Sequence, residues 1–133
     1  MSKVDFKKEY KELFAPPKKF VVVDVPEMQF LMVDGHGDPN TAQAYKDAVE
    51  ALYAVAYKAK FLSKKQLDQD YVVPPLEGLW WADDMDGAFR VGGDRSLWHW
   101  TAMILQPDDI TAEMVDAARE QAQGKKDASP LLD

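Results

Sequence analysis

Glu77 lies in the segment PPLEGLWWADD, residues 74–84, where two prolines precede it and Trp80 and Trp81 follow it. Moving a carboxylate into an apolar environment costs several kcal/mol unless a cation or a hydrogen bond compensates it. A buried Glu77 therefore has a raised pKa and can accept a proton near neutral pH as a general base. The neighbouring indole rings can stack on a flat ligand or hold a cation, at about 0.5–2 kcal/mol for each cation–ring contact. Two interpretations stay open: an acid inside a ligand pocket, or a solvent-facing Glu77 beside tryptophans of the core.

The alternation of side chains along a strand decides which aromatic residues share a side with Glu77. Trp81 falls on the side of Glu77 and Trp80 on the other, so Trp81 is the favoured partner of the acid. Tyr71 is expected on the opposite face unless a bulge at Pro74–Pro75 turns it toward the site. Glu77 is the candidate catalytic residue. The candidate ligand-binding residues are Glu77, Trp81, Trp80, Trp98, Trp100 and Tyr71.

Other chemistry finds little support in the sequence. His36 and His99 are the only histidines, and neither belongs to a spacing typical of a metal site. The segment GAFRVGGDR has paired glycines but lacks the lysine of a phosphate-binding loop, and no GxSxG motif marks a serine nucleophile. We therefore expect no metal and no cofactor.

Composition and charge narrow the class of protein. The chain has 133 residues, of which 47% are hydrophobic and 29% charged, as in one ordinary globular domain. It has no cysteine, which excludes disulfides and fits a reducing cytoplasm. Residues 71–133 carry the whole net charge of −7, and this acidity disfavours nucleic acid as a partner. Because the first residues are charged and no apolar run is long enough to cross a membrane, we expect a cytoplasmic protein without a membrane partner.

The pattern of apolar residues and turn formers predicts an α+β fold with an antiparallel sheet. Asn40, with Gln43 three positions later, is the expected N-cap of a long amphipathic helix, and Thr111 is that of the last helix. Pro74 and Pro75 indicate an edge strand or a bulge. The expected elements are a helix at 4–14, a hairpin of strands at 20–25 and 28–37, a helix at about 41–61, a second hairpin of strands at 71–82 and 96–105, and a helix at 111–123.

Both faces of this sheet carry large apolar side chains. A sheet with one solvated face would show a polar side. The long helix covers one face, so a second layer is needed on the other. The last helix, a partner chain or a ligand are the alternatives.

Three segments of the chain together resemble the GyrI-like small-molecule-binding proteins. The segments are MVDGHGDPN (32–40), PPLEGLWW (74–81) and WHWTAMILQPDDIT (98–111). The resemblance covers about residues 5–124. It implies a strand–helix–strand–strand unit, the first of two such halves in the fold shared with effector-binding domains of multidrug regulators. Residues 1–124 would be one half-module, with its core at 19–106, and residues 125–133 a tail or linker.

The resemblance also implies what the protein does. Its members bind flat, lipophilic and often cationic compounds against aromatic walls and an acidic residue, and some are hydrolases that open cyclopropanoid DNA-alkylating compounds. Binding is the leading hypothesis, with Glu77 as the counter-charge. The alternatives are a hydrolase in which Glu77 activates or orients water, and a protein-interaction module such as a gyrase inhibitor. Because the second half is lacking, we expect either a homodimer or a missing half-module to complete the pocket.

Overall fold

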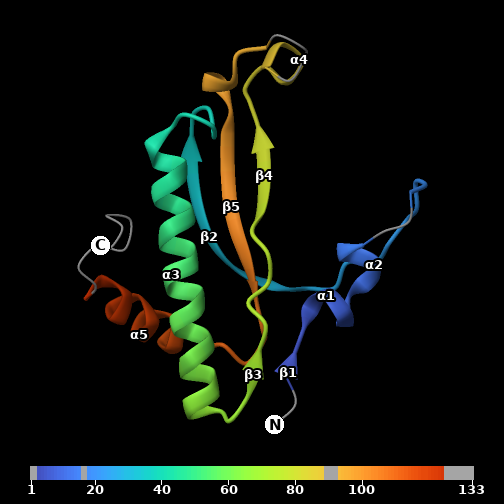
Figure 1. Ribbon diagram of the computed structural model, residues 1–133. Helices are drawn as coiled ribbons and strands as arrows, with labels where there is room; N and C mark the ends of the chain where they lie inside the picture. The colour runs from blue at the N-terminus through green and yellow to red at the C-terminus, as the bar shows by residue number, and fades with distance from the viewer. Residues whose placement is uncertain (1–2, 16–17, 89–92, 125–133) are drawn as a thin grey trace.

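The computed structural model describes residues 3–15, 18–88 and 93–124, and its centre is a three-stranded antiparallel sheet. The strands are β2 (Gln29–His36), β4 (Glu77–Trp81) and β5 (His99–Gln106), in the order β2-β5-β4. The long helix α3 (Gln43–Gln66) lies across one face, and α5 (Ala112–Gln123) packs beside α3 (Figure 1). The predicted α+β fold class and the strand–helix–strand–strand order are confirmed.

Smaller elements surround this unit. They are β1 (Lys3–Val4), which pairs in parallel with β3 (Asp70–Tyr71), two one-turn helices α1 (Phe6–Glu9) and α2 (Lys11–Phe14), helix α4 (Met85–Ala88) and a 3-10 turn at Arg95–Leu97. The expected helix at 4–14 is therefore two turns that break at Tyr10. Figure 1 shows α1 and α2 on the side of β4 that faces away from α3.

The core forms between α3 and the face of the sheet that carries Trp100, Ala102 and Ile104 of the central strand. Alternation places these three on one side of β5, and all three are buried. They pack against Ala48 and Leu52 of the helix. Small residues on α3 let the helix approach the sheet closely enough to enclose the Trp100 ring.

The helix ends follow different rules. Thr111 caps α5 as predicted, because its hydroxyl oxygen accepts a hydrogen bond from the Met114 backbone N–H at 3.2 Å. Asn40 does not cap α3. The N-cap is Ala42, which offers no side-chain hydrogen bond, while the Asn40 N–H donates to the Asp38 carboxylate at 2.9 Å. With this turn at Asp38–Asn40, α3 begins at Gln43, two residues after the expected start at residue 41.

Two of the predicted strands are shorter than expected, and a third is absent. Residues 20–25 form no strand, so the first hairpin does not exist. The stretch 71–82 is broken between β3 and β4, where Pro74 and Pro75 remove backbone donors. β4 is an edge strand, as the prolines indicated. The strand expected at 96–105 begins at His99, after the 3-10 turn.

The face of the sheet that is turned away from α3 is only partly covered. The register of the two ladders places on it Phe30, Met32, Asp34 and His36 of β2, His99, Thr101, Met103 and Leu105 of β5, and Glu77, Leu79 and Trp81 of β4. Met32 and Leu79 are each 54% exposed. Within the described ranges, no helix combines the length and hydropathy needed to cross a membrane.

Candidate functional site

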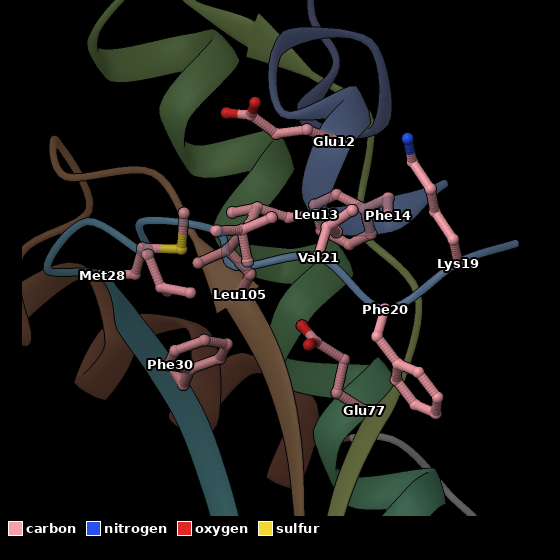
Figure 2. Close-up of a pocket in the computed structure, with 12 residues that line it drawn as sticks. Glu12, Leu13, Phe14, Lys19, Phe20, Val21, Met28, Phe30, Glu77 and Leu105 are labelled. Atoms are coloured by element: carbon pink, nitrogen blue, oxygen red, sulfur yellow. The ribbon is translucent and has the colours of Figure 1, made fainter. Parts of the chain in front are cut away.

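Glu77 is the first residue of β4, and it stands opposite Met103 on the open face of the sheet. Its side chain enters a pocket of about 440 Å³ (Figure 2). The β4–β5 ladder fixes the backbone of Glu77, and alternation along the strand sets the face of the sheet on which its side chain lies. The Glu77 residue is intermediate in exposure, so it is neither sealed in the core nor fully in solvent.

The walls of this pocket are largely apolar and come from four parts of the chain. Phe14 comes from α2, Phe20 from the segment before the sheet, Phe30 from β2 and Leu105 from β5. Figure 2 shows Phe30 and Leu105 on the sheet side and Val21 across from them. The complete lining is Glu12, Leu13, Phe14, Lys19, Phe20, Val21, Val23, Val25, Met28, Phe30, Glu77 and Leu105.

The environment of Glu77 favours its neutral form. Burial raises the pKa of the Glu77 carboxyl above its ordinary value of 4.5. No side chain in the described part of the chain forms an ion pair with this carboxylate. Glu12 and Lys19 also line the pocket, but Figure 2 shows their charged ends directed away from the Glu77 oxygens. An uncompensated carboxylate among hydrocarbon groups attracts a cation or a proton.

The structure does not bring the tryptophans to this pocket. Trp81 shares the open face with Glu77, as alternation predicted, but it lies at the far end of β4. It is 40% exposed, and its ring stacks on His99 with centroids 5.8 Å apart. The acid is therefore surrounded by phenylalanines and aliphatic side chains, and the expectation of indole walls is corrected.

The other three tryptophans lie on the helix side of the sheet or at its end. Trp100 is 1% exposed and meets the Tyr45 ring edge-on at 5.1 Å. The centroid of the Trp80 ring lies 5.7 Å from that of Tyr45 and 5.9 Å from that of Trp98. These rings fill the space between β4, β5 and α3, so they belong to the core and its rim.

Tyr71 is also distant from the pocket. It is 1% exposed, and it packs in the cluster between α3 and α5 with residues such as Met114. Its hydroxyl lies 3.4 Å from Oε1 of Gln106, and burial raises the pKa of Tyr71 well above its usual range. The Pro74–Pro75 step ends the strand after Tyr71 and does not turn it toward Glu77.

The two histidines form a separate pair on the open face. The His36 and His99 rings have centroids 4.5 Å apart, and His99 Nε2 lies 3.7 Å from Asp83. Among the described residues, no three His, Asp or Glu side chains come together as metal ligands would. The pair is a cross-strand contact of neighbouring strands.

Sequence reasoning missed the phenylalanine walls. Phe14 fell inside the expected helix at 4–14 and Phe20 inside the expected strand at 20–25, and neither was connected with Glu77. A usable signal existed in FVVVDV, residues 20–25, where six residues contain five large apolar side chains. An extended segment with that composition is expected to cover an apolar surface with one of its sides. In the structure that surface is the pocket that Glu77 also lines.

No protein-family model matches the sequence, and no match was found among curated proteins. Solved structures are similar. A protein from Listeria innocua described as an uncharacterized conserved protein is 48% identical, with a TM-score of 0.83 over 95% of this chain and 62% of its own. A hydrolase encoded by lin2189 from Listeria innocua is also 48% identical, with a TM-score of 0.83 over 96% of this chain and 62% of its own. A third structure, a hydrolase from Listeria innocua, is 47% identical with a TM-score of 0.79 over 95% of this chain and 60% of its own. This chain therefore spans about three fifths of the length of the proteins it matches.

Proposed function

We propose that this chain is a GyrI-like protein that binds a lipophilic small molecule in the Glu77 pocket and hydrolyses it. The observation that supports this most is the half-buried Glu77, whose carboxylate projects into an apolar pocket and has no compensating cation among the residues that the structure describes. A volume of about 440 Å³ falls in the range of pockets that hold drug-sized ligands.

The reaction assigns one proton transfer to Glu77. Its carboxylate accepts a proton from a water molecule while the water oxygen bonds to a carbon of a strained ring. The ring carbon–carbon bond breaks, and its electron pair passes to the electron-withdrawing group conjugated with the ring. That group then takes up the proton, so the net change is the addition of one water. A cyclopropanoid alkylator meets these requirements.

Two observations support hydrolysis over binding alone. Burial raises the pKa of Glu77 toward neutrality, and a general base is most effective when its pKa lies near the working pH. Two of the similar solved structures, 47–48% identical over nearly all of this chain, are described as hydrolases.

Binding without turnover is the second candidate function. It is favoured by the absence of any other acid or base directed at Glu77 among the described pocket residues, since a counter-charge needs no partner. In that case a flat cationic guest would be held by Glu77 and by the phenylalanine rings at about 0.5–2 kcal/mol for each cation–ring contact.

One experiment separates the two functions. The protein is incubated with a cyclopropanoid alkylator, and the product that has gained one water is measured by mass spectrometry for wild type, Glu77→Gln and Glu12→Gln. Hydrolysis predicts a loss of about 10²–10⁴-fold in turnover for Glu77→Gln with retained binding of the neutral guest. Glu12→Gln, a change at an exposed acid of the same pocket, is expected to keep turnover. Equal turnover in wild type and Glu77→Gln would refute the assignment of the base.

A further inference from the structure

Residues 20–25 have the side-chain pattern of a β-strand without a strand partner. Exposure alternates over residues 20–23: Phe20 is 107% exposed, Val21 44%, Val22 99% and Val23 40%, while Val25, on the side of Val21 and Val23, is 67% exposed. A period of two is the signature of an extended strand with one covered side. Nevertheless, no backbone hydrogen bond joins these residues to another described segment.

The covered side of this segment is one wall of the Glu77 pocket. Val21, Val23 and Val25 line the pocket, and Figure 2 shows the backbone running past Glu77 through Lys19, Phe20 and Val21. The wall is therefore held by side-chain contacts alone. Unpaired N–H and C=O groups beside β-branched residues form a template for another strand.

We propose that residues 18–24 pair in antiparallel fashion with the same residues of a second copy of the chain. A twofold axis perpendicular to a two-stranded ribbon requires that some residue faces its own equivalent. If that residue is Val21, Lys18 stands opposite the partner's Asp24, and the axis repeats this charge pair at the other end.

The same register matches the fully exposed apolar side chains. Phe20 stands opposite the partner's Val22, so the ribbon carries two aromatic–β-branched pairs between its two charge pairs. Cross-strand pairs of both kinds stabilise antiparallel strands. Moving the axis by one residue, to Val22, would place Phe20 opposite the partner's Asp24 and leave no charge pair. A register centred on Val23 would pair Lys19 with the partner's Glu27, but it would extend the ribbon through Pro26, which has no backbone N–H to donate. The register centred on Val21 gives the charge pairs without a proline in the ribbon, and we therefore choose it.

Pairing would complete the pocket from outside. Because the axis preserves the two faces of the ribbon, the partner's Val21 lies beside Val21 on the pocket side. Each copy thereby extends the apolar wall of the other, and the two Glu77 pockets lie under one ribbon. The competing occupant is a further segment of the same chain, such as the part of the longer solved relatives that lies outside the match.

The first test is a charge exchange, measured by sedimentation velocity without any ligand. Wild type is expected to dimerise, and Asp24→Lys is expected to weaken the dimer by about tenfold or more, because two attractive pairs become repulsive. The double change Lys18→Asp with Asp24→Lys restores both pairs and is expected to restore the dimer. Lys18 and Asp24 are exposed, so far-UV circular dichroism should show unchanged folding in all variants. A monomeric wild type, or a dimer that Asp24→Lys leaves intact, would overturn the proposal.

The second test reads the register. The natural chain has no cysteine, so a single introduced cysteine reports only its own neighbourhood. Val21→Cys is expected to form a disulfide-linked dimer quickly, because directly opposite residues come within disulfide reach. Val22→Cys is the matched control and is expected to cross-link much more slowly. Faster cross-linking at residue 22 would overturn the register. Neither test uses turnover, so their outcome is independent of whether Glu77 hydrolyses a substrate.

Discussion

Replacing Gly35 by alanine tests whether the sheet is packed as described. Gly35 stands directly opposite Trp100 in the β2–β5 ladder, and both lie on the face that α3 covers. A Cβ atom at residue 35 would overlap with ring carbons of Trp100. The ring cannot simply move aside, because it is 1% exposed and contacts Tyr45.

The expected loss follows from the cheaper of two ways to relieve this overlap. Expelling the indole from the core resembles the loss of a buried tryptophan, about 3–5 kcal/mol. Separating the strands locally resembles overpacking, about 1–3 kcal/mol. Alanine recovers about 0.5–1 kcal/mol through the lower entropy of the unfolded chain. We therefore expect Gly35→Ala to lower the free energy of unfolding by about 1–2 kcal/mol, which is a fall in Tm of about 3–10 °C for a domain of this size.

Thermal unfolding followed by near-UV circular dichroism measures this change, because the signal reports ordered tryptophans. Gly124→Ala is the control. At that position φ is −73°, and a Cβ would meet the carbonyl oxygens of Gln121 at 3.5 Å and Glu120 at 4.0 Å, both ordinary contacts. Its Tm should stay close to that of wild type. If Gly35→Ala melts together with Gly124→Ala, the indole does not lie over residue 35, and the packing of β2 on β5 described above is wrong.

Three further changes test the site and the helix. The pKa of Glu77 is raised in the folded state, so the contribution of this group to stability is present below its ordinary pKa of 4.5 and is lost as the pH rises through the raised value. Glu77→Gln should therefore be more stable than wild type at neutral pH. Denaturant titrations should show that this difference in the free energy of unfolding vanishes in acid. Turnover needs the ionised form and should rise with pH over the same range, whereas a flat profile would exclude Glu77 as the base. Phe30→Ala should weaken binding of a lipophilic guest by about 1–3 kcal/mol in fluorescence titrations, while Trp81→Ala should leave it nearly unchanged; the opposite order would place the guest at the far end of β4. Thr111→Ala should lower the free energy of unfolding by about 0.5–2 kcal/mol in denaturant titrations, because the Met114 N–H loses its acceptor, and an unchanged value would show that α5 does not depend on this cap.

The sequence was sufficient for features that depend on local periodicity. The spacing of apolar residues predicted α3 and α5, and Thr111 was identified as a cap from its type and its position alone. The strand at 96–105 was expected from its composition, and the structure has it as β5 from His99 to Gln106. In each case the residues that decide the outcome are neighbours in the chain or lie within one or two turns.

Features that depend on distant partners were not predictable in the same way. Residues 20–25 have strand composition, but a strand also needs a neighbour, and none of the described segments supplies one. Trp98 and Trp100 were candidate pocket walls because they are aromatic, whereas tertiary packing against Tyr45 and Trp80 places them at the core and its rim. The pocket itself joins α2, β2, β4 and the segment before β2, a combination that no single stretch of sequence encodes.

The acid and the walls of the pocket are held by different means, and this division has a consequence for selectivity. Glu77 is fixed by the ladder to β5, whereas Val21 and Val23 sit on a segment without backbone hydrogen bonds. A group on a strand keeps its position within narrow limits, and a segment without such bonds has low local stability. The outline of the pocket can therefore adapt more readily than the backbone position of Glu77. Under the proposed function, a site built in this way would accept lipophilic molecules of different shapes and act on those that place an electrophilic or cationic atom next to Glu77.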